Sequence, residues 1–384
     1  MTAVGFDLVV VGAGVTGAST ALAGARRGLR TLLLERFQLG HRRGSSSGPS
    51  RIMRLAYDDP GYIRLAQDAY ARWLDLERLT GEALLLRTGG LDFGRSGLPS
   101  LRRTAEAMTA AGVAFTEYSG AELAKRFPRL WFEPDTVGLY QDDGAVLNAD
   151  ACIRTLAAAA VRAGAEIRES AQAQDIRSAG DGVALAVNGE QVQAGAVVVA
   201  AGSWVNEALT GVELALPAKV TREQVAYFAV TEPGYEPDSF PVTIEHQADH
   251  PYMISMFPQL EPGGGIKLML DRNGPQIEAE DFSTELSDDA LAALAGHADR
   301  RLRGIGGIQR AETCRYTMLP DSDFVLDVVP GHPRIGIAAA CSGHGFKFGP
   351  AIGEVMVDLV TTGAAAGHDV RPFSVTRPAL AAPG

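Results

Sequence analysis

The stretch DLVVVGAGVTGASTALAGARRGLRTLLLE, residues 7–35, decides the fold. The apolar, β-branched run at 6–11 predicts a buried strand, and small apolar residues at helical spacing over 15–27 predict a helix that Gly28 ends. A second apolar run at 30–34 predicts another buried strand. A strand–helix–strand unit of this length is typical of a parallel sheet.

Glycines stand where such a unit binds a dinucleotide. Gly12, Gly14 and Gly17 form the pattern G-x-G-x-x-G. The first glycine permits a tight turn, the second lets a pyrophosphate approach the backbone, and the third lets helix and strand pack closely. The helix begins at Val15 and Thr16, where free N–H groups can face the phosphates.

An acidic residue completes this pattern. Glu35 ends the second strand, where it can accept hydrogen bonds from a ribose. The combination predicts an adenine dinucleotide, and a glycine-rich turn without a ligand is the alternative. The pattern alone does not distinguish NAD from FAD.

The polar loop after Glu35 favours FAD. An extended flavin nucleotide needs hydrogen-bond donors along its pyrophosphate and ribityl chain. The loop supplies them as Arg42, Arg43, Ser45, Ser46, Ser47 and Arg51. A solvated basic loop is the alternative. Near the other end of the chain, the glycine-rich run CSGHGFKFG (341–349) precedes the final helix and offers a second place where N–H groups can face an anion.

The composition argues against charged partners and metals. The chain has 384 residues and a net charge of -11, which disfavours nucleic acid and anionic membranes. No apolar run reaches the roughly 18 residues that span a bilayer, and no signal-peptide pattern is visible. Cys152, Cys314 and Cys341 show no CxxC spacing, so we expect neither a disulfide frame nor a zinc site. The cytoplasm is the expected compartment.

Two kinds of segment alternate along the chain. Helices are predicted at 62–79, 101–111, 148–163, 288–303 and up to about 362, and strands at 84–93, 166–176, 182–187, 192–199 and 335–340. Strands and loops fill 219–270. This order predicts a nucleotide-binding domain made of 1–84, 145–217 and 308–384, and a substrate-binding domain made of 85–144 and 218–307.

Six segments together resemble the monomeric sarcosine oxidase family, within the D-amino acid oxidase-like flavoenzymes. They are VVVGAGVTG (9–17), GSSSGPSRIMRLAY (44–57), VVVAAGSW (197–204), CRYTMLPDSDFVLD (314–327), SGHGFKF (342–348) and SVTRPAL (374–380). They cover nearly the whole chain in the family's order. The resemblance implies an α/β fold with a Rossmann-type, glutathione-reductase-like FAD-binding domain, interleaved with a substrate domain on a mixed or antiparallel sheet.

The resemblance also implies roles for individual residues. Lys347 and Arg54 match the residues that hold a substrate carboxylate, and Lys267 matches the lysine that activates oxygen. Cys314 matches the cysteine that binds the flavin covalently through its 8α-methyl group, although an inert buried cysteine is the alternative. The remaining cofactor contacts would be Arg36, Arg43, Ser46, Ser47, Arg51, Ala173, Ala201, Gly202, Trp204, Gly343, His344, Gly345, Phe346 and Lys347.

Departures from the family pattern concern the substrate. Ser47 and Asp271 stand where the family has histidines, and the pocket tyrosine region reads PYMISMFP (251–258), with Tyr252 as the candidate. Asp271 could bind a substrate amine or cap a turn. Methionines adapt to irregular ligands, so a bulkier, more apolar substrate than sarcosine is expected.

The expected activity is oxidation of the C–N bond of an N-methyl or cyclic amino acid by a monomeric FAD enzyme. Oxygen would be the second substrate, and an imine or aldehyde and hydrogen peroxide the products. A cyclic imino acid such as pipecolate or proline, or a larger biosynthetic amine, is an alternative substrate. Three rival functions are a nicotinamide-dependent dehydrogenase, a flavin dehydrogenase that makes no peroxide, and a non-catalytic binding subunit. The presence of both Lys347 and Arg54 weighs against the last.

Overall fold

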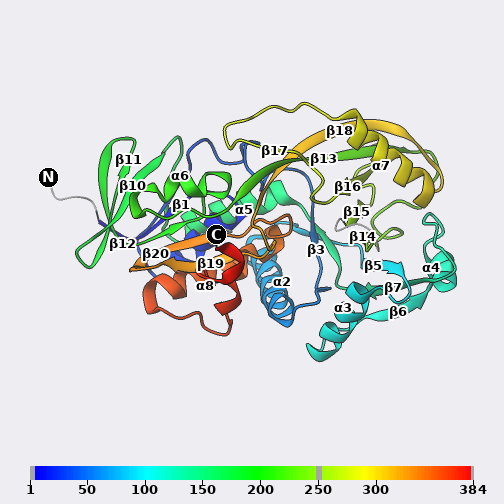
Figure 1. Ribbon diagram of the computed structural model, residues 1–384, viewed down its shortest axis with the longest axis horizontal. Helices are drawn as coiled ribbons and strands as arrows, with labels where there is room; N and C mark the ends of the chain where they lie inside the picture. Colours follow the sequence, from blue (N-terminus) through cyan, green and yellow to red (C-terminus); the bar gives the residue numbers. More distant parts are fainter. Residues whose placement is uncertain (1–4, 248–252, 382–384) are drawn as a thin grey trace.

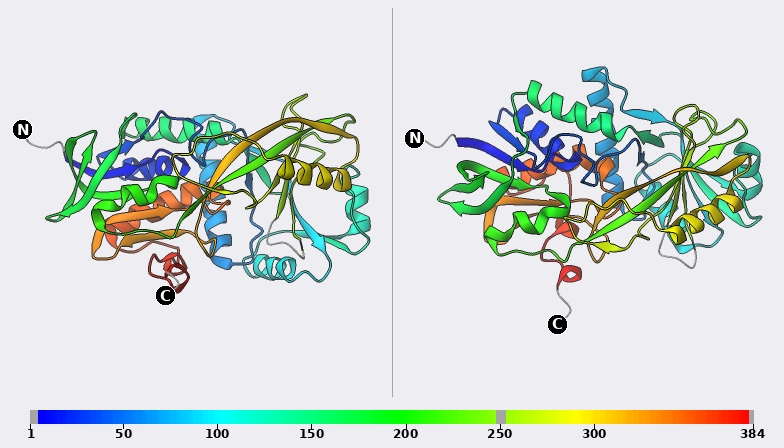
Figure 2. Two further views of the ribbon diagram at one scale, coloured as in Figure 1. Left: turned by 45° about the horizontal axis from the view of Figure 1, so that its top comes forward. Right: turned by 90° about the horizontal axis from the view of Figure 1, so that it is seen from above.

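The computed structural model describes residues 5–247 and 253–381. Two large β-sheets lie side by side along the long axis of the molecule (Figures 1 and 2). Segments from the start, middle and end of the chain build the first sheet, which confirms the interleaved α/β architecture. No helix in the described ranges is both long enough and apolar enough to cross a bilayer.

The first sheet has a parallel centre. Its strands are β1 (Gly5–Val11), β2 (Thr31–Leu34), β9 (Glu166–Arg168), β10 (Ala173–Ala179), β11 (Gly182–Val187), β12 (Glu190–Val199), β19 (Val325–Val329) and β20 (His332–Ala339). Their order is β10-β11-β12-β1-β2-β9, and β20 pairs with β12 and β19. β1 runs parallel to β2 and β12, and Val9 and Val10 of β1 are fully buried, which explains its unbroken apolar run.

Helices pack on both large sheets. The helices are α1 (Val15–Arg26), α2 (Pro60–Thr80), α3 (Pro99–Ala110), α4 (Gly120–Arg126), α5 (Ala149–Arg162), α6 (Val205–Ala208), α7 (Asp288–Arg301) and α8 (Gly349–Thr362). α3, α4 and α7 pack on the second sheet, and α1 contacts both α5 and α8. A Cβ on Gly353 would lie 2.6 Å from the backbone of Ser19, so glycine allows α8 to approach α1 closely.

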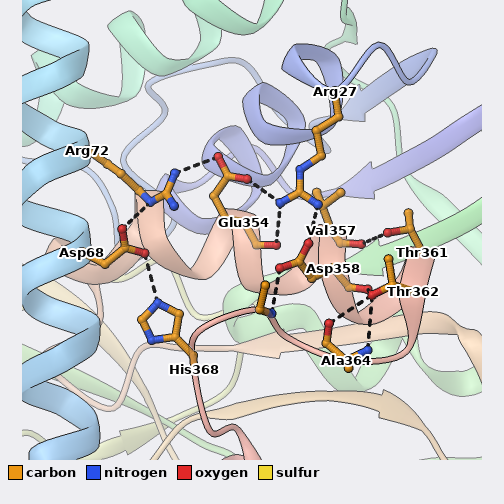
Figure 3. A network of polar contacts seen from close by, with 11 residues as sticks. Arg27, Asp68, Arg72, Glu354, Val357, Asp358, Thr361, Thr362, Ala364 and His368 are labelled. Atoms are coloured by element: carbon orange, nitrogen blue, oxygen red, sulfur yellow. Dashed lines mark hydrogen bonds and ion pairs between the residues drawn. The ribbon is translucent and has the colours of Figure 1, made fainter.

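An ion-pair network holds α8 in place (Figure 3). Glu354 of α8 accepts from Arg27, which follows α1, at 2.5 Å, and from Arg72 of α2 at 2.9 Å. Asp358, one turn later, accepts from Arg27 at 2.5 Å. The network therefore ties three helices together just beyond the glycine-rich run that carries Lys347.

The second sheet is mainly antiparallel. Its strands are β5 (Gly90–Arg95), β6 (Thr116–Ser119), β7 (Thr136–Gln141), β13 (Lys219–Val230), β14 (Val242–Glu245), β15 (Ile254–Phe257), β16 (Ile266–Leu270), β17 (Gln276–Ile277) and β18 (Ile305–Met318). Their order is β17-β13-β16-β15-β14-β5-β7-β6, β18 pairs with β13, and only β14 and β5 are parallel among the described pairs. A small third sheet, β3 (Arg51–Met53), β8 (Ala145–Leu147) and β4 (Leu85–Arg87), joins the two regions.

Two predicted strands differ from the observed ones, and one long observed strand was not predicted. The single strand expected at 84–93 is two strands, β4 and β5, which separate at Gly89 (φ +70°) and enter different sheets. The strand expected at 166–176 is likewise divided into β9 and β10. β18 was not predicted, because its glycines and charged residues hide the strand pattern. Residues 308–318, predicted within the nucleotide-binding domain, pair with β13 in the second sheet.

Candidate active site

The glycine motif forms a close turn between β1 and α1. Gly12 has a φ of +98°, and a Cβ there would lie 2.6 Å from the carbonyl oxygen of Ala200. A Cβ on Gly17 would lie 1.8 Å from the carbonyl oxygen of Gly12. Gly14 is the N-cap of α1 and has no side chain that could accept from the helix N–H groups. Backbone N–H groups are thus left for an anionic ligand, as a pyrophosphate requires.

Two backbone N–H groups fix the carboxylate of Glu35 just after β2. Its Oε2 accepts from the N–H of Ala13 at 3.0 Å, and its Oε1 accepts from the N–H of Phe37 at 2.8 Å. Burial alone would raise the pKa of Glu35, but hydrogen bonds from His41 and these two amides hold it below its usual value. The carboxylate is therefore charged at neutral pH and suited to accept from ribose hydroxyls.

The polar loop closes over the start of α1. Arg51 donates to the carbonyl oxygens of Ser45 and Ser47 at 2.8 and 2.6 Å, which fixes the loop. Ser46 Oγ accepts from the N–H of Val15 at 3.1 Å. The Ser45 hydroxyl is buried and has no hydrogen-bond partner among the described residues. An orphaned hydroxyl beside a glycine cradle fits a bound nucleotide.

A cavity of about 750 Å³ runs from the glycine cradle and Glu35 to the second sheet. Its length suits an extended dinucleotide with a substrate at the far end. Phe346, in the run before α8, forms part of the lining. The ring of Phe346 is parallel to that of the buried Trp73, with centroids 6.3 Å apart.

One face of the second sheet forms the far wall of this cavity. Side chains on a strand alternate between its two faces. Lys267 and Met269 of β16, and Asp271 just beyond it, line the cavity, whereas Leu268 is buried in the core behind the sheet. The neighbouring strands contribute in register: Val225, Tyr227, Ile244, His246, Met253, Ser255, Phe257, Glu312 and Cys314.

Lys267 is a buried amine with few partners. Its Nζ donates to Ser50 Oγ at 3.1 Å and lies 4.4 Å from the ring centroid of Phe257. Burial, and then the neighbouring Arg51 guanidinium, lower the pKa of Lys267 to about 7. Such an amine can exchange a proton or supply positive charge near neutral pH.

Cys314 lies on β18 at the same wall. It packs against Tyr227 and Met269 and is a free thiol. Burial raises the pKa of its thiol to about 11, while Arg51 and Lys267 favour the thiolate. Nearby cations are what a thiol needs in order to act as a nucleophile.

Arg54 is the first of two buried cations at the substrate end. Its Nη1 donates to the carbonyl oxygen of Ala56 and lies 3.2 Å from Asp92 Oδ1 of β5. Its guanidinium carbon lies 4.5 Å from the ring centroid of Tyr57. The planar guanidinium group of Arg54, fixed by these contacts, can present its remaining N–H donors to a carboxylate.

Lys347 is the second cation, and it is only 4 % exposed. Its Nζ donates to Tyr57 Oη at 2.8 Å and to the carbonyl oxygen of His344 at 2.7 Å. Burial, and then Arg54, lower its pKa well below the usual value. An anion bound beside it would reverse part of that effect, so this pair of cations is suited to a carboxylate.

Comparison with known proteins agrees with this geometry. The family model described as "FAD dependent oxidoreductase" (DAO) matches residues 7–359. The chain belongs to this family. It is therefore an FAD-dependent oxidoreductase that acts on C–N bonds.

Two sarcosine oxidases illustrate the relationship. The monomeric sarcosine oxidase of Streptomyces avermitilis is 31% identical over 383 residues, which cover 98% of each chain. The peroxisomal sarcosine oxidase of Mus musculus is 32% identical over 380 residues, 97% of this chain and 96% of its own. Among solved structures, the open form of NikD, an unusual amino acid oxidase essential for nikkomycin biosynthesis, superposes with a TM-score of 0.83 at 24% identity, over 96% of this chain and 97% of that one. This last likeness shows the shared fold.

Most residues predicted for the family's cofactor and substrate reach the cavity. They are Gly12, Gly14, Val15, Thr16, Glu35, Arg36, Ser46, Ser47, Arg51, Arg54, Ala173, Ala201, Gly202, Trp204, Lys267, Asp271, Cys314, Gly343, His344, Gly345, Phe346 and Lys347. Gly17 instead provides the close helix–strand contact. Tyr252 lies outside the described residues.

Arg43 is the clearest difference from these predictions. Its guanidinium stacks on the rings of Phe37 and Phe282, at 4.6 and 5.0 Å from their centroids, and it is not among the lining residues. Arg42, next to it, does line the cavity. The turn geometry of the loop places these two adjacent arginines differently, which the sequence could not show.

Asp271 lies just beyond β16, at the wall of the cavity. Burial raises its pKa, against the effect of Arg272, whose Nε lies 3.2 Å from Asp271 Oδ2. A Cβ on Gly343 would lie 3.1 Å from Asp271 Oδ1, so this carboxyl group borders the glycine-rich run. Its position at the cavity wall favours contact with a ligand over a purely structural turn cap.

Sequence reasoning missed several residues of the substrate end. Tyr57 stands inside a segment that carries the family resemblance, but no role was assigned to it. Asp92 interrupts the apolar strand β5 and is 1 % exposed, and its Oδ1 lies 3.1 Å from Nε2 of His246. A charged residue in a buried strand was the available signal.

Proposed function

We propose that this enzyme oxidises the C–N bond of a secondary amino acid, N-methylated or cyclic, with oxygen. The products would be an imine, or the aldehyde formed by its hydrolysis, and hydrogen peroxide. One observation carries the proposal: the buried Lys347 and Arg54, whose side chain is only 11 % exposed, share a cavity with the dinucleotide cradle. A carboxylate held there places the rest of an amino acid beside the cofactor.

The two cations determine how the substrate sits. The charge and geometry of Arg54 and Lys347 favour a carboxylate. Binding of the substrate carboxylate by both cations selects which C–H bond is presented for oxidation. FAD, when bound, supplies the acceptor for the hydride that leaves the carbon next to nitrogen. The substrate nitrogen must be neutral for that C–H bond to yield a hydride. Asp271 lies close enough to Lys347 to influence the protonation of the substrate nitrogen.

Lys267 is proposed to work with oxygen. Positive charge near the reacting centre stabilises the negative charge that oxygen gains as it is reduced to peroxide. Lys267 is anchored by Ser50, and no hydrogen bond among the described residues links it to Arg54 or Lys347.

Cys314 is proposed to bind the flavin covalently. Its place on the cavity wall, with Arg51 and Lys267 as neighbouring cations, supports attachment. Cys314 and Cys341 both line the cavity, whereas Cys152 is fully buried in the core.

The wall chemistry supports a substrate larger than sarcosine. Met253, Ser255 and Met269 line the substrate end, and Asp271 replaces the family's histidine. Methionine side chains adapt to irregular apolar groups. A cyclic imino acid such as pipecolate or proline, or a larger biosynthetic amine, is the alternative within the same chemistry. We propose that the enzyme acts as a monomer.

The test is a screen of sarcosine, N-methylated amino acids, proline and pipecolate. Anaerobic bleaching of the flavin absorbance identifies the substrate, and a peroxide assay in air identifies the acceptor. We expect bleaching by at least one secondary amino acid, and peroxide in equal amount to product. Bleaching without peroxide would indicate a dehydrogenase. A colourless protein that binds NAD, or no bleaching by any of these compounds, would contradict the proposal.

A further inference from the structure

Tyr57 touches both cations of the substrate clamp. Its Oη lies 2.8 Å from Lys347 Nζ, and its ring centroid lies 4.5 Å from the guanidinium carbon of Arg54. One residue therefore sets where each cation stands relative to the other. Tyr57 is 9 % exposed, so water competes little for these contacts.

The direction of the hydrogen bonds follows from their partners. His344 Nε2 lies 3.2 Å from the carbonyl oxygen of Ser322, which can only accept, so Nε2 carries a proton. Burial lowers the pKa of His344 well below its usual value, so the ring is neutral and Nδ1 is an acceptor. Nδ1 lies 3.3 Å from Tyr57 Oη, and Tyr57 must donate to it. The oxygen of Tyr57 is then free to accept from Lys347.

This chain of bonds leaves one donor for the substrate. An ammonium group has three N–H donors. Tyr57 Oη accepts one from Lys347, and the carbonyl oxygen of His344 accepts a second at 2.7 Å. The third N–H has no hydrogen-bond partner among the described residues and can meet a carboxylate.

Tyr57 is itself held firmly. Its ring stacks on Tyr62, with centroids 5.4 Å apart and planes 20° apart, and contacts Phe348 at 5.5 Å. Arg54 bonds to the carbonyl oxygen of Ala56, the residue before Tyr57, so the backbone cannot shift independently of the clamp. A site whose supporting residues are fixed in this way binds its ligand in one geometry.

We propose that Tyr57 is a positioning residue that makes the clamp selective for a substrate carboxylate, through its oxygen toward Lys347 and its ring toward Arg54. This inference rests on the proposed function. It predicts that an α-carboxylate is required and that an amide or a simple amine is a poor substrate.

The charge state of Lys347 gives a specific signature. The groups that face it are Arg54, Asp271, Asp92, His344 and Tyr57. Burial raises the pKa of Tyr57 to about 12, so its hydroxyl stays neutral and acts on Lys347 as a dipole. Loss of that acceptor destabilises the ammonium form. Affinity for a carboxylate falls as Lys347 deprotonates with rising pH. In a variant without the Tyr57 hydroxyl, this fall should occur at a lower pH than in the parent.

The experiment uses Tyr57→Phe and Tyr57→Leu holoenzymes, with Tyr62→Phe as the matched control. Tyr62 stacks on Tyr57, but its hydroxyl donates to Asp323 at 2.9 Å rather than to the clamp. Propionate, a carboxylate without an amine, is titrated against the visible flavin spectrum from pH 6 upward. We expect Tyr57→Phe to weaken propionate about tenfold, and to lower the pH at which affinity is lost by about one unit, as loss of one hydrogen bond to a charged group implies. Tyr57→Leu, which also loses the ring contact with Arg54, should weaken propionate further.

The outcomes separate this inference from the proposed function. With a substrate in hand, KM should rise in Tyr57→Phe while kcat changes little, and Tyr62→Phe should match the parent. Propionate affinity within twofold of the parent, with an unmoved pH midpoint, would overturn the role of Tyr57. Equal losses in Tyr62→Phe would also overturn it, because they would indicate general disturbance of the aromatic cluster. If propionate binds as expected but no secondary amino acid reduces the flavin, the proposed reaction fails while the role of Tyr57 stands.

Discussion

Replacing Lys347 with methionine tests the substrate clamp most directly. Methionine has a similar length and no charge, and position 347 is buried, so the change removes an ammonium group with little change in volume. Arg54 remains as the second cation. The hydrogen bond from Trp73 Nε1 to the Lys347 carbonyl oxygen, 2.8 Å long, involves only the backbone of residue 347 and should persist.

The size of the effect follows from the contact that is lost. A hydrogen bond to a charged group contributes about 1.5–3 kcal/mol, which corresponds to a fall of about 10- to 150-fold in kcat/KM. The acceptors on Tyr57 and His344 also lose their donor, which places the effect toward the upper end. Thermal unfolding should change little, because a costly buried charge is removed at the same time.

Anaerobic stopped-flow reduction measures this without interference from oxygen. The dependence of the bleaching rate on substrate concentration gives an apparent dissociation constant and a limiting rate. A rise in the dissociation constant should account for most of the loss of kcat/KM. Lys125→Met, on the exposed surface of α4, is the matched control and should behave as the parent. A Lys347→Met enzyme whose kcat/KM stays within threefold of the parent would refute the assignment of Lys347 to the substrate.

Three further predictions concern the cofactor and oxygen. Lys267→Met should slow reoxidation of the reduced enzyme in air while leaving anaerobic reduction nearly unchanged. In the parent enzyme, reoxidation should slow as the pH rises through about 7, where Lys267 loses its positive charge. A reoxidation rate that does not change with pH would count against this role. Cys314→Ser should release its flavin into the supernatant on acid precipitation, whereas the parent keeps it in the pellet; release from both proteins would show that no covalent bond forms. Gly17→Ala should yield protein without yellow colour, because the added Cβ would lie 1.8 Å from the Gly12 carbonyl oxygen, whereas Gly5→Ala, with no atom within 4 Å, should keep its absorbance.

Local patterns predicted the parts of the fold that depend on local physics. The strand, glycine turn and helix of residues 6–27 follow from apolar periodicity and from the space that only glycine leaves. β18 could not be predicted in this way, because its polar residues form a strand only beside β13, which lies about 85 residues earlier.

The site shows the same division. Arg54 and Lys347 were assigned from a family resemblance, but no spacing rule selects Tyr57, which contacts both of them. Asp92, the ion-pair partner of Arg54, meets His246 only because β5 and β14 pair in parallel. Local sequence does not show contacts made by the pairing of distant strands, and for that reason the supporting residues were missed.

The alternation of side chains along the cavity wall also limits how this enzyme can change. A deletion that slipped β16 by one residue would turn Leu268 toward the cofactor and bury Lys267 in the core. Strand lengths are therefore fixed by the chemistry they carry. Single substitutions at Met253 or Ser255 face no such penalty, because neither residue touches the clamp or Ser50 through a described hydrogen bond. Selection for a new amine can thus act on the wall one position at a time, while the oxidation chemistry is inherited intact.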